Sequence, residues 1–163
     1  MFTAGGGLLA VAGLAATLAV GPAAFADTAP TTANAEVTSA ITLTGEAAFT
    51  LTQVPGETAT AASTLTATTN NTAGYDVTVL ADAAQLAGTG TNTDVIEVSS
   101  LEVLNSGSTY AGLSTTVPVT VHTQSVKSAA GGDALAADYR LLMPFVNSDT
   151  YSGGLTFTAA ANS

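Results

Sequence analysis

The chain of 163 residues contains no cysteine, which excludes disulfide bonds, a thiol nucleophile and a zinc–thiolate site. It also contains no tryptophan. Cationic residues are nearly as scarce, because only Lys127 and Arg140 stand against twelve acidic residues, and the formal net charge is −10. Binding to nucleic acid requires clustered lysine and arginine, so we expect no nucleic-acid partner. Attraction to an anionic membrane surface is disfavoured for the same reason.

Charged residues of either sign make up only 9% of the sequence, whereas hydrophobic residues make up 47%. Disordered chains combine low hydrophobicity with high charge, so this composition indicates a folded protein. With so few charges, the surface is predicted to be covered mainly by threonine, serine, asparagine and alanine.

The N-terminal segment has the features of a secretory signal peptide. The run GLLAVAGLAATLAV (7–20) is apolar, and Ala24 and Ala26 flank Phe25 in an A-x-A pattern, which predicts cleavage after Ala26. No basic residue precedes the run, so a start upstream of Met1 stays open. A retained membrane anchor is the alternative, although a span needs about 20 apolar residues.

These features predict three segments: a signal peptide at 1–26, a flexible leader at 27–35 and a β-sandwich domain at 36–163. Removing 26 of the 163 residues leaves a chain the size of one domain. We expect the mature protein to be secreted, and to be extracellular or held non-covalently at the cell wall, with no membrane contact after signal cleavage.

Beyond the leader, apolar and polar residues alternate with a period of two, which predicts β-strands. The phase of the pattern changes at Ser99–Ser100, which indicates a bulge or bend between two strands. Pro118 marks an edge strand or a bulge, because it cannot donate to a ladder. In residues 81–88, the alanine-rich composition could give one helical turn before Gly88. The expected strand segments are 36–44, 47–54, 63–69, 75–81, 94–104, 115–123, 138–146 and 151–159.

About eight short strands separated by turns predict an all-β fold, an antiparallel two-layer β-sandwich. Within it, alternation predicts the inward side of each strand, including Val37, Ile41 and Leu43 in the first. The residues expected to share one core are Phe49, Tyr75, Val77, Val119, Leu141 and Phe157.

Two segments, TTNNTAGYDVTVLA (68–81) and DYRLLMPFVNSDTYSGGLTFTA (138–159), resemble secreted Gram-positive surface modules, and most of all the WxL-type cell-wall-binding domain. The signature tryptophan of that family is absent, and Phe157 stands where an aromatic residue is expected. Fibre and pilin-like subunits are similar in the same region. The resemblance implies an immunoglobulin-like surface sandwich that binds cell-wall polymer or other copies of itself. The matching positions are Tyr151, Leu155, Thr156 and Phe157.

The sequence offers little material for catalysis. The single histidine, His122, is predicted to face solvent on the side of its strand opposite the valines, and no G-x-S-x-G motif accompanies it. Glu97 and Glu102, with nearby Asp94, are candidates for the carboxylate pair of a glycosidase. They are an odd number of residues apart, however, so they point to opposite faces unless the bulge changes the phase. We predict no catalytic residue and no cofactor.

Calcium is the remaining candidate ligand. Asn92, Asp94 and Glu97 lie in the glycine-rich stretch GTGTNTDVIE (88–97), and Asp133 follows a second glycine pair. Such oxygen ligands suit calcium, but no D-x-D-x-D-G run is present, and turn capping by the same side chains is the preferred interpretation. We therefore predict no metal-binding residue.

Two further residues have known chemistry in surface proteins. Lys127 would have to lie beside a buried acid to form an isopeptide crosslink, but its place at a strand end predicts that it is exposed. Asn70 fits the N-x-T sequon, which matters only in a host that glycosylates proteins.

The predicted function is that of a secreted, non-enzymatic structural or cell-wall-binding, adhesive module. The alternative is a secreted carbohydrate-binding or hydrolytic domain, with or without calcium. Residues 36–44 could pair within their own domain or be donated to the sheet edge of a neighbouring copy, so a strand-exchange polymer also stays open.

Overall fold

The computed structural model describes residues 31–45 and 48–163, and the predicted signal peptide lies outside the described residues. Residues 31–40 form no regular secondary structure, and all of them are exposed. Within the described part of the chain, no helix is long and apolar enough to cross a membrane. Residues Val37–Ser163 form one compact unit.

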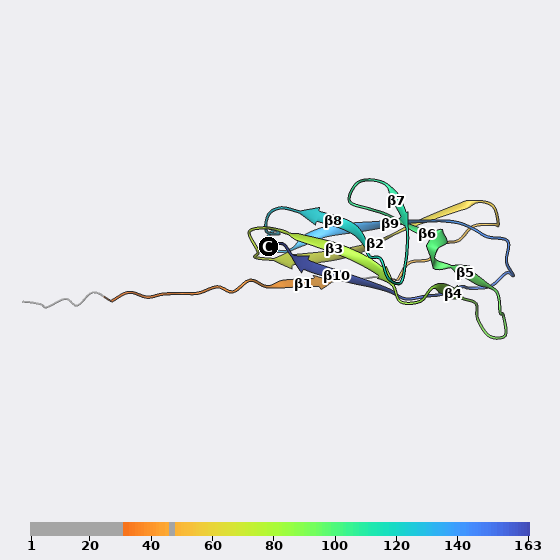
Figure 1. Ribbon diagram of the computed structural model, residues 1–163, viewed down its shortest axis with the longest axis horizontal. Helices are drawn as coiled ribbons and strands as arrows, with labels where there is room; N and C mark the ends of the chain where they lie inside the picture. The colour runs from red at the N-terminus through yellow and green to blue at the C-terminus, as the bar shows by residue number, and fades with distance from the viewer. Residues whose placement is uncertain (1–30, 46–47) are drawn as a thin grey trace, which may run out of the picture. The chain divides into compact units, whose positions relative to one another are not determined.

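The described residues form ten β-strands in antiparallel sheets and no α-helix (Figure 1). The prediction of an all-β antiparallel fold is confirmed, but about eight strands was too few. The strands are β1 (Ile41–Thr44), β2 (Thr58–Thr69), β3 (Tyr75–Ala81), β4 (Gln85–Ala87), β5 (Val95–Glu97), β6 (Leu101–Leu104), β7 (Tyr110–Gly112), β8 (Val119–Gln124), β9 (Asp133–Leu142) and β10 (Leu155–Ala161), with a single 3₁₀ turn, η1, at Val98–Ser100.

The strands are arranged in three sheets. The largest has five strands in the order β1-β2-β9-β6-β7, the second has three in the order β10-β3-β8, and β4 pairs with β5 in a third. One core cluster includes Val79 of β3, Val103 of β6 and Tyr139 of β9, so it is shared by the two larger sheets. The fold therefore has a β-sandwich-like character, with apolar faces of two sheets buried against each other.

The core consists of two clusters and not the single predicted one. Tyr75 and Val77 belong to the cluster that also contains Leu65 of β2, whereas Leu141 belongs to the cluster around Tyr139. Phe157 is partly buried and packs against both clusters. It therefore links the two halves of the core.

The N-terminal strand predictions were only partly right. Of the predicted strand 36–44, only β1 forms, with Ile41 and Leu43 half-buried, while Val37 is 82% exposed. The predicted strand 47–54 forms no strand in its described part. Phe49 nevertheless packs inward as predicted, because its ring stacks on that of Tyr139 with the centroids 4.1 Å apart.

The predicted change of phase at Ser99–Ser100 is confirmed as the turn η1. It separates β5, in the two-stranded sheet, from β6, in the five-stranded sheet. Because the turn adds one residue to the pattern, Glu97 and Glu102 both lie on the side away from the core. Pro118 directly precedes β8, which is an edge strand of the three-stranded sheet, so the edge predicted from this proline is also confirmed. The helical turn that was an option for 81–88 does not form, since β4 lies there.

Candidate binding surface

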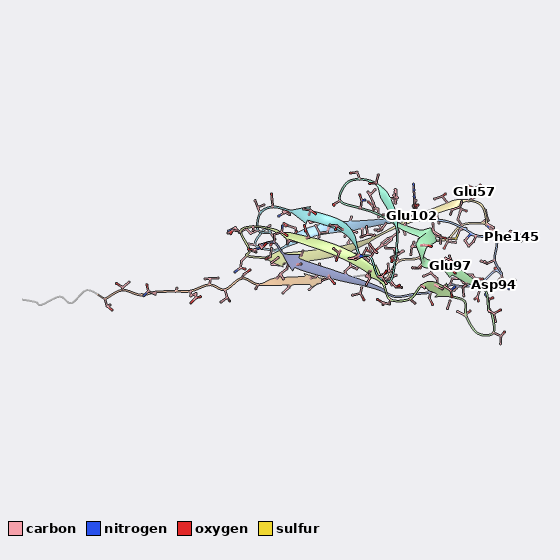
Figure 2. The ribbon with its side chains drawn as sticks, in the orientation of Figure 1. Glu57, Asp94, Glu97, Glu102 and Phe145 are labelled. Atoms are coloured by element: carbon pink, nitrogen blue, oxygen red, sulfur yellow. The ribbon has the colours of Figure 1, made fainter. Side chains whose placement is uncertain are left out.

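Three large apolar side chains are exposed where the connection before β2 meets the end of β9. Phe145 is 96% exposed, Leu142 60% and Val54 61%. Figure 2 shows Phe145 at the extremity of the domain, beyond the ends of the strands. Apolar side chains that are exposed next to one another mark interaction surfaces more often than scattered single ones do. Of these three, Leu142 and Phe145 are three residues apart and line one hollow, and we call these two residues the Phe145 surface.

A hollow of about 680 Å³ lies beside this surface. Its volume is within the range of sites that bind small molecules. The walls combine apolar side chains with serine hydroxyls and one carboxylate. The lining residues are Pro55, Gly56, Ser99, Ser100, Glu102, Leu142, Met143, Pro144 and Phe145.

The loop that carries Phe145 is held on both sides. Before Phe145, Met143 forms two backbone hydrogen bonds with the β1–β2 connection, accepting from Gly56 N (2.9 Å) and donating to Glu57 O (3.0 Å). After it, Asn147 N donates to Asp94 Oδ2 (2.9 Å), and Tyr151 Oη donates to Asn147 O (2.8 Å). The exposed ring is therefore presented by an ordered backbone, which lowers the conformational entropy that a partner must remove on binding.

A second set of polar contacts, the Asp149 clasp, ties the glycine-rich segment 88–94 to the loop 147–151. The carboxylate of Asp149 accepts hydrogen bonds from Thr89 Oγ1 and Thr89 N, from Asn92 Nδ2 (2.7 Å) and from Thr150 N (2.7 Å). These hydrogen bonds, first those of the Thr89 and Asn92 side chains, hold the pKa of Asp149 well below its usual range. The clasp further fixes the loop that carries Phe145.

Four acidic residues lie at the same end of the domain, namely Glu57, Asp94, Glu97 and Glu102 (Figure 2). Glu97 accepts a hydrogen bond from Gln85 Nε2 (2.6 Å). Glu102 is paired with Arg140 Nε at 2.5 Å and raises the pKa of that guanidinium, which also lies over the ring of Tyr110.

The second cation of the chain is remote from this end. Lys127 lies in the connection before Asp133, where β9 begins, whereas the Phe145 surface adjoins Leu142, where β9 ends. With Arg140 neutralised by Glu102, the surroundings of the Phe145 surface carry an excess of negative charge.

His122 is half-buried and lies on the inward face of β8, so the prediction that it faces solvent was wrong. The pairing of β3 with β8 shifts register between Val77 and Thr78, which places His122 opposite the buried Val77. The imidazole lies 5.4 Å from the ring of Tyr75, and its Nε2 atom is buried with no hydrogen-bond partner among the described residues. The bulge thus turns a residue of the predicted outer face inward.

Tyr75 joins His122 to a polar network around Asp133. Tyr75 Oη and Gln124 Nε2 both donate to Asp133 Oδ2, at 2.8 and 2.9 Å, and Ala129 N donates to Oδ1 at 3.0 Å. Burial, followed by the bond to Asp133, raises the pKa of Tyr75, while the Ala129 and Tyr75 bonds lower the pKa of Asp133. The protonated, buried phenol of Tyr75 therefore ties β3 to the first residue of β9.

The candidate calcium ligands do not converge. Asn92 Oδ1 accepts from Asp94 N (3.0 Å), Asp94 and Glu97 bind different partners, and Asp133 belongs to the Tyr75 network. Within residues 31–45 and 48–163, no three acidic or histidine side chains are placed to hold a metal ion. These side chains instead cap turns and tie loops together.

The structure also describes the surroundings of Lys127 and Asn70, the candidates for a crosslink and for glycosylation. Lys127 is exposed, as predicted. The Asn70 amide is engaged in tying down the chain before β1, because Oδ1 accepts from Ala40 N (2.8 Å) and Nδ2 donates to Thr38 O (2.8 Å).

The Phe145 surface was not anticipated from the sequence. Residues 138–146 were predicted as one strand, but β9 ends at Leu142, two residues before Pro144. Pro144 and the consecutive apolar residues Leu141, Leu142 and Met143, which break the alternation, were the available signals of that end.

Comparisons of the chain with family models, with curated proteins and with solved structures found no match. An account of function therefore depends on the geometry of the described residues.

Proposed function

We propose that the protein is a secreted, non-enzymatic cell-surface module, structural or adhesive, which holds cell-wall polymer or a neighbouring surface protein through the Phe145 surface. The observation that carries the proposal is the near-complete exposure of Phe145 on a loop that is anchored on both sides. An apolar ring that contributes little to its own fold, yet is held in place, is explained by a partner that covers it.

We also propose that the sandwich is immunoglobulin-like. The five-stranded sheet places β1, β2, β9 and β6 side by side, and the chain passes to the three-stranded sheet after β2, after β7 and after β9. This order corresponds to the A-B-E-D sheet of immunoglobulin domains, with β3 in the position of strand C. The correspondence supports the assignment, as does the antiparallel pairing throughout.

The second candidate function is a secreted carbohydrate-binding domain. It is favoured by one observation, an exposed aromatic ring beside a hollow that contains the serine hydroxyls of Ser99 and Ser100. The hydrolytic form of this alternative lacks support, because Glu102 is paired with Arg140 and Glu97 is bonded to Gln85.

Co-sedimentation with isolated Gram-positive cell walls tests the proposal. The mature chain (27–163) and its Phe145→Ser variant are mixed with walls that retain or lack their proteins, and the bound fraction is measured. Val126→Ser is the matched control. Val126 is also a large apolar residue that is exposed (57%), but it lies in the connection between β8 and β9.

We expect the parent chain and Val126→Ser to sediment with the walls, and Phe145→Ser to remain in solution. Circular dichroism and the thermal midpoint of each variant verify that the fold is retained. Equal sedimentation of all three chains, or none by the parent, contradicts the proposed role of this surface. Release of reducing sugar from the walls would instead favour the hydrolytic alternative.

A further inference from the structure

We infer that the occupant of the Phe145 surface is a polypeptide segment of another protein in which an apolar side chain is flanked by lysine or arginine. The inference rests on the proposed function, since it takes the Phe145 surface to be the binding surface, and it goes further by naming the chemistry of the partner. Three features of the described residues carry it.

The first feature is the combination of a protruding ring with a hollow. Phe145 and Leu142 stand out from the surface, while Met143 and Pro144 form part of the wall of the adjacent hollow of about 680 Å³. Aromatic and methionine side chains at the centre of a patch, with polar groups around them, are the composition of protein–protein hot spots. An apolar side chain of the partner would enter the hollow and contact the ring.

The second feature is the charge around the patch. Glu57, Asp94 and Glu97 lie at this end together with Glu102, whose charge is already neutralised by Arg140 (Figure 2). The remaining carboxylates favour a cationic partner and repel an anionic one, which disfavours a phosphate-bearing wall polymer as the direct occupant. The cations of the partner would lie near its apolar residue, because the acids and Phe145 lie at the same end of the domain.

The third feature excludes a second copy of this chain as the occupant. The whole sequence contains two cationic side chains, and Arg140 is held by Glu102 and by the ring of Tyr110. Only Lys127 remains, and the residues on either side of it, Val126 and Ser128, offer a single exposed apolar side chain. Two copies with a net charge of −10 each would also repel one another.

A peptide array tests the inference with the folded mature chain as the soluble probe. The array consists of twelve-residue peptides in which the number of lysines and the number of phenylalanines or leucines vary independently, and in which Glu replaces Lys in a matched set. Peptides that bind are then titrated in solution by fluorescence anisotropy, at low and at high salt. The variants are Phe145→Ser and the double variant Glu57→Gln/Glu97→Gln, with Val126→Ser and Asp138→Asn as the apolar and charge controls.

We expect binding only where lysine and apolar residues occur together, and none in the glutamate set. Phe145→Ser should weaken binding about tenfold, as truncation of a hot-spot residue does. The double carboxylate variant should weaken it by a similar factor at low salt and by less at high salt, where the charges are screened. The controls should bind as the parent does.

Each other outcome overturns the inference in a distinguishable way. If no peptide binds while protein-free walls still retain the chain in a Phe145-dependent manner, the proposed function stands and the occupant is a wall polymer. If peptides bind equally to Phe145→Ser, the attraction is general electrostatics and the site is elsewhere. If Phe145→Ser abolishes self-association measured by sedimentation velocity, the occupant is a second copy.

Discussion

At the scale of single residues, two phenylalanines of this chain have opposite roles. Phe157 is partly buried and packs against both core clusters, whereas Phe145 is almost fully exposed. The two side chains have the same apolar area, so their environments alone decide what each contributes to the free energy of folding. One holds the two halves of the core together, and the other is available to a partner.

The two residues should therefore respond differently to truncation. We expect Phe157→Ala to lower the free energy of unfolding by about 3 kcal/mol, because it leaves a gap that touches both clusters. Phe145→Ala should change it by less than about 0.5 kcal/mol, as surface substitutions do. Urea unfolding at pH 7 measures both. A loss below about 1 kcal/mol for Phe157→Ala would mean that β10 does not close the core as described.

Two glycines give a second matched pair. Gly74 and Gly56 both have a positive φ, of 90° and 86°, where a side chain is strained. A Cβ atom on Gly74 would also lie 1.8 Å from the carbonyl oxygen of Gln124, whereas one on Gly56 would meet nothing within 4 Å. Gly74 therefore lets the turn before β3 approach the end of β8.

We expect Gly56→Ala to cost only the conformational strain, about 1–2 kcal/mol. Gly74→Ala adds a backbone clash, which raises the cost to about 3 kcal/mol or more. Thermal and urea unfolding of the two variants measure the difference. Equal losses would show that Gln124 moves away without cost and that the turn is not tightly packed.

At the scale of elements, alternation predicted the strands that have one buried and one exposed face. The prediction succeeded for β3 and β10, and it located the turn between β5 and β6 from the serine pair alone. It failed for β4 and β7, which have three residues each, whereas β5, equally short, lay within the longer predicted segment 94–104.

Other features depend on contacts between distant segments and carry no local signal. His122 faces inward because β3 and β8 shift register, and that shift is set by their pairing. Phe49 packs inward without a strand because the ring of Tyr139 lies there to receive it. The hollow beside Phe145 combines three segments that are distant in the sequence, at residues 55–56, 99–102 and 142–145, so only the fold could bring them together.

The Asp149 clasp links two loops, and its effect on stability should depend on pH. The pKa of Asp149 is lowered in the folded protein, so its carboxylate stabilises the fold above the unfolded pKa of about 4. This contribution is lost as the pH falls further, toward the folded pKa. We expect Asp149→Asn to be less stable than the parent at pH 7, and the difference to shrink as the pH falls below about 4.

Unfolding in urea at pH 7, 5, 4 and 3 measures this difference, and the comparison with the parent removes the separate contribution of Asp133, whose pKa is also lowered. Glu57→Gln serves as the control, since its carboxylate accepts no hydrogen bond from the described residues. A stability difference for Asp149→Asn that stays constant over this range would mean that the clasp does not depend on the charge.

At the scale of the whole molecule, β1 decides whether the chain closes on itself or pairs with a neighbour. β1 has four residues, pairs with β2 and is tied by Asn70 and by Thr69 Oγ1, which donates to Ala40 O at 2.8 Å. In the other sheet, Pro118 precedes the edge strand β8, and β10 has one edge that pairs with no strand in the described part of the chain. Both a cis-closed β1 and an acceptor edge are therefore present.

We expect the mature chain to be a monomer at low and high concentration, because the bonds from Asn70 and Thr69 hold β1 in its own sheet and the net charge of −10 opposes association. Deletion of residues 27–44 should then expose the edge of β2 and produce aggregation, since an unpaired strand edge recruits other chains. Size-exclusion chromatography with light scattering measures both. High-mass species in the full mature chain that disappear on the deletion would contradict this expectation, and would show that residues 36–44 are donated between copies through main-chain hydrogen bonds.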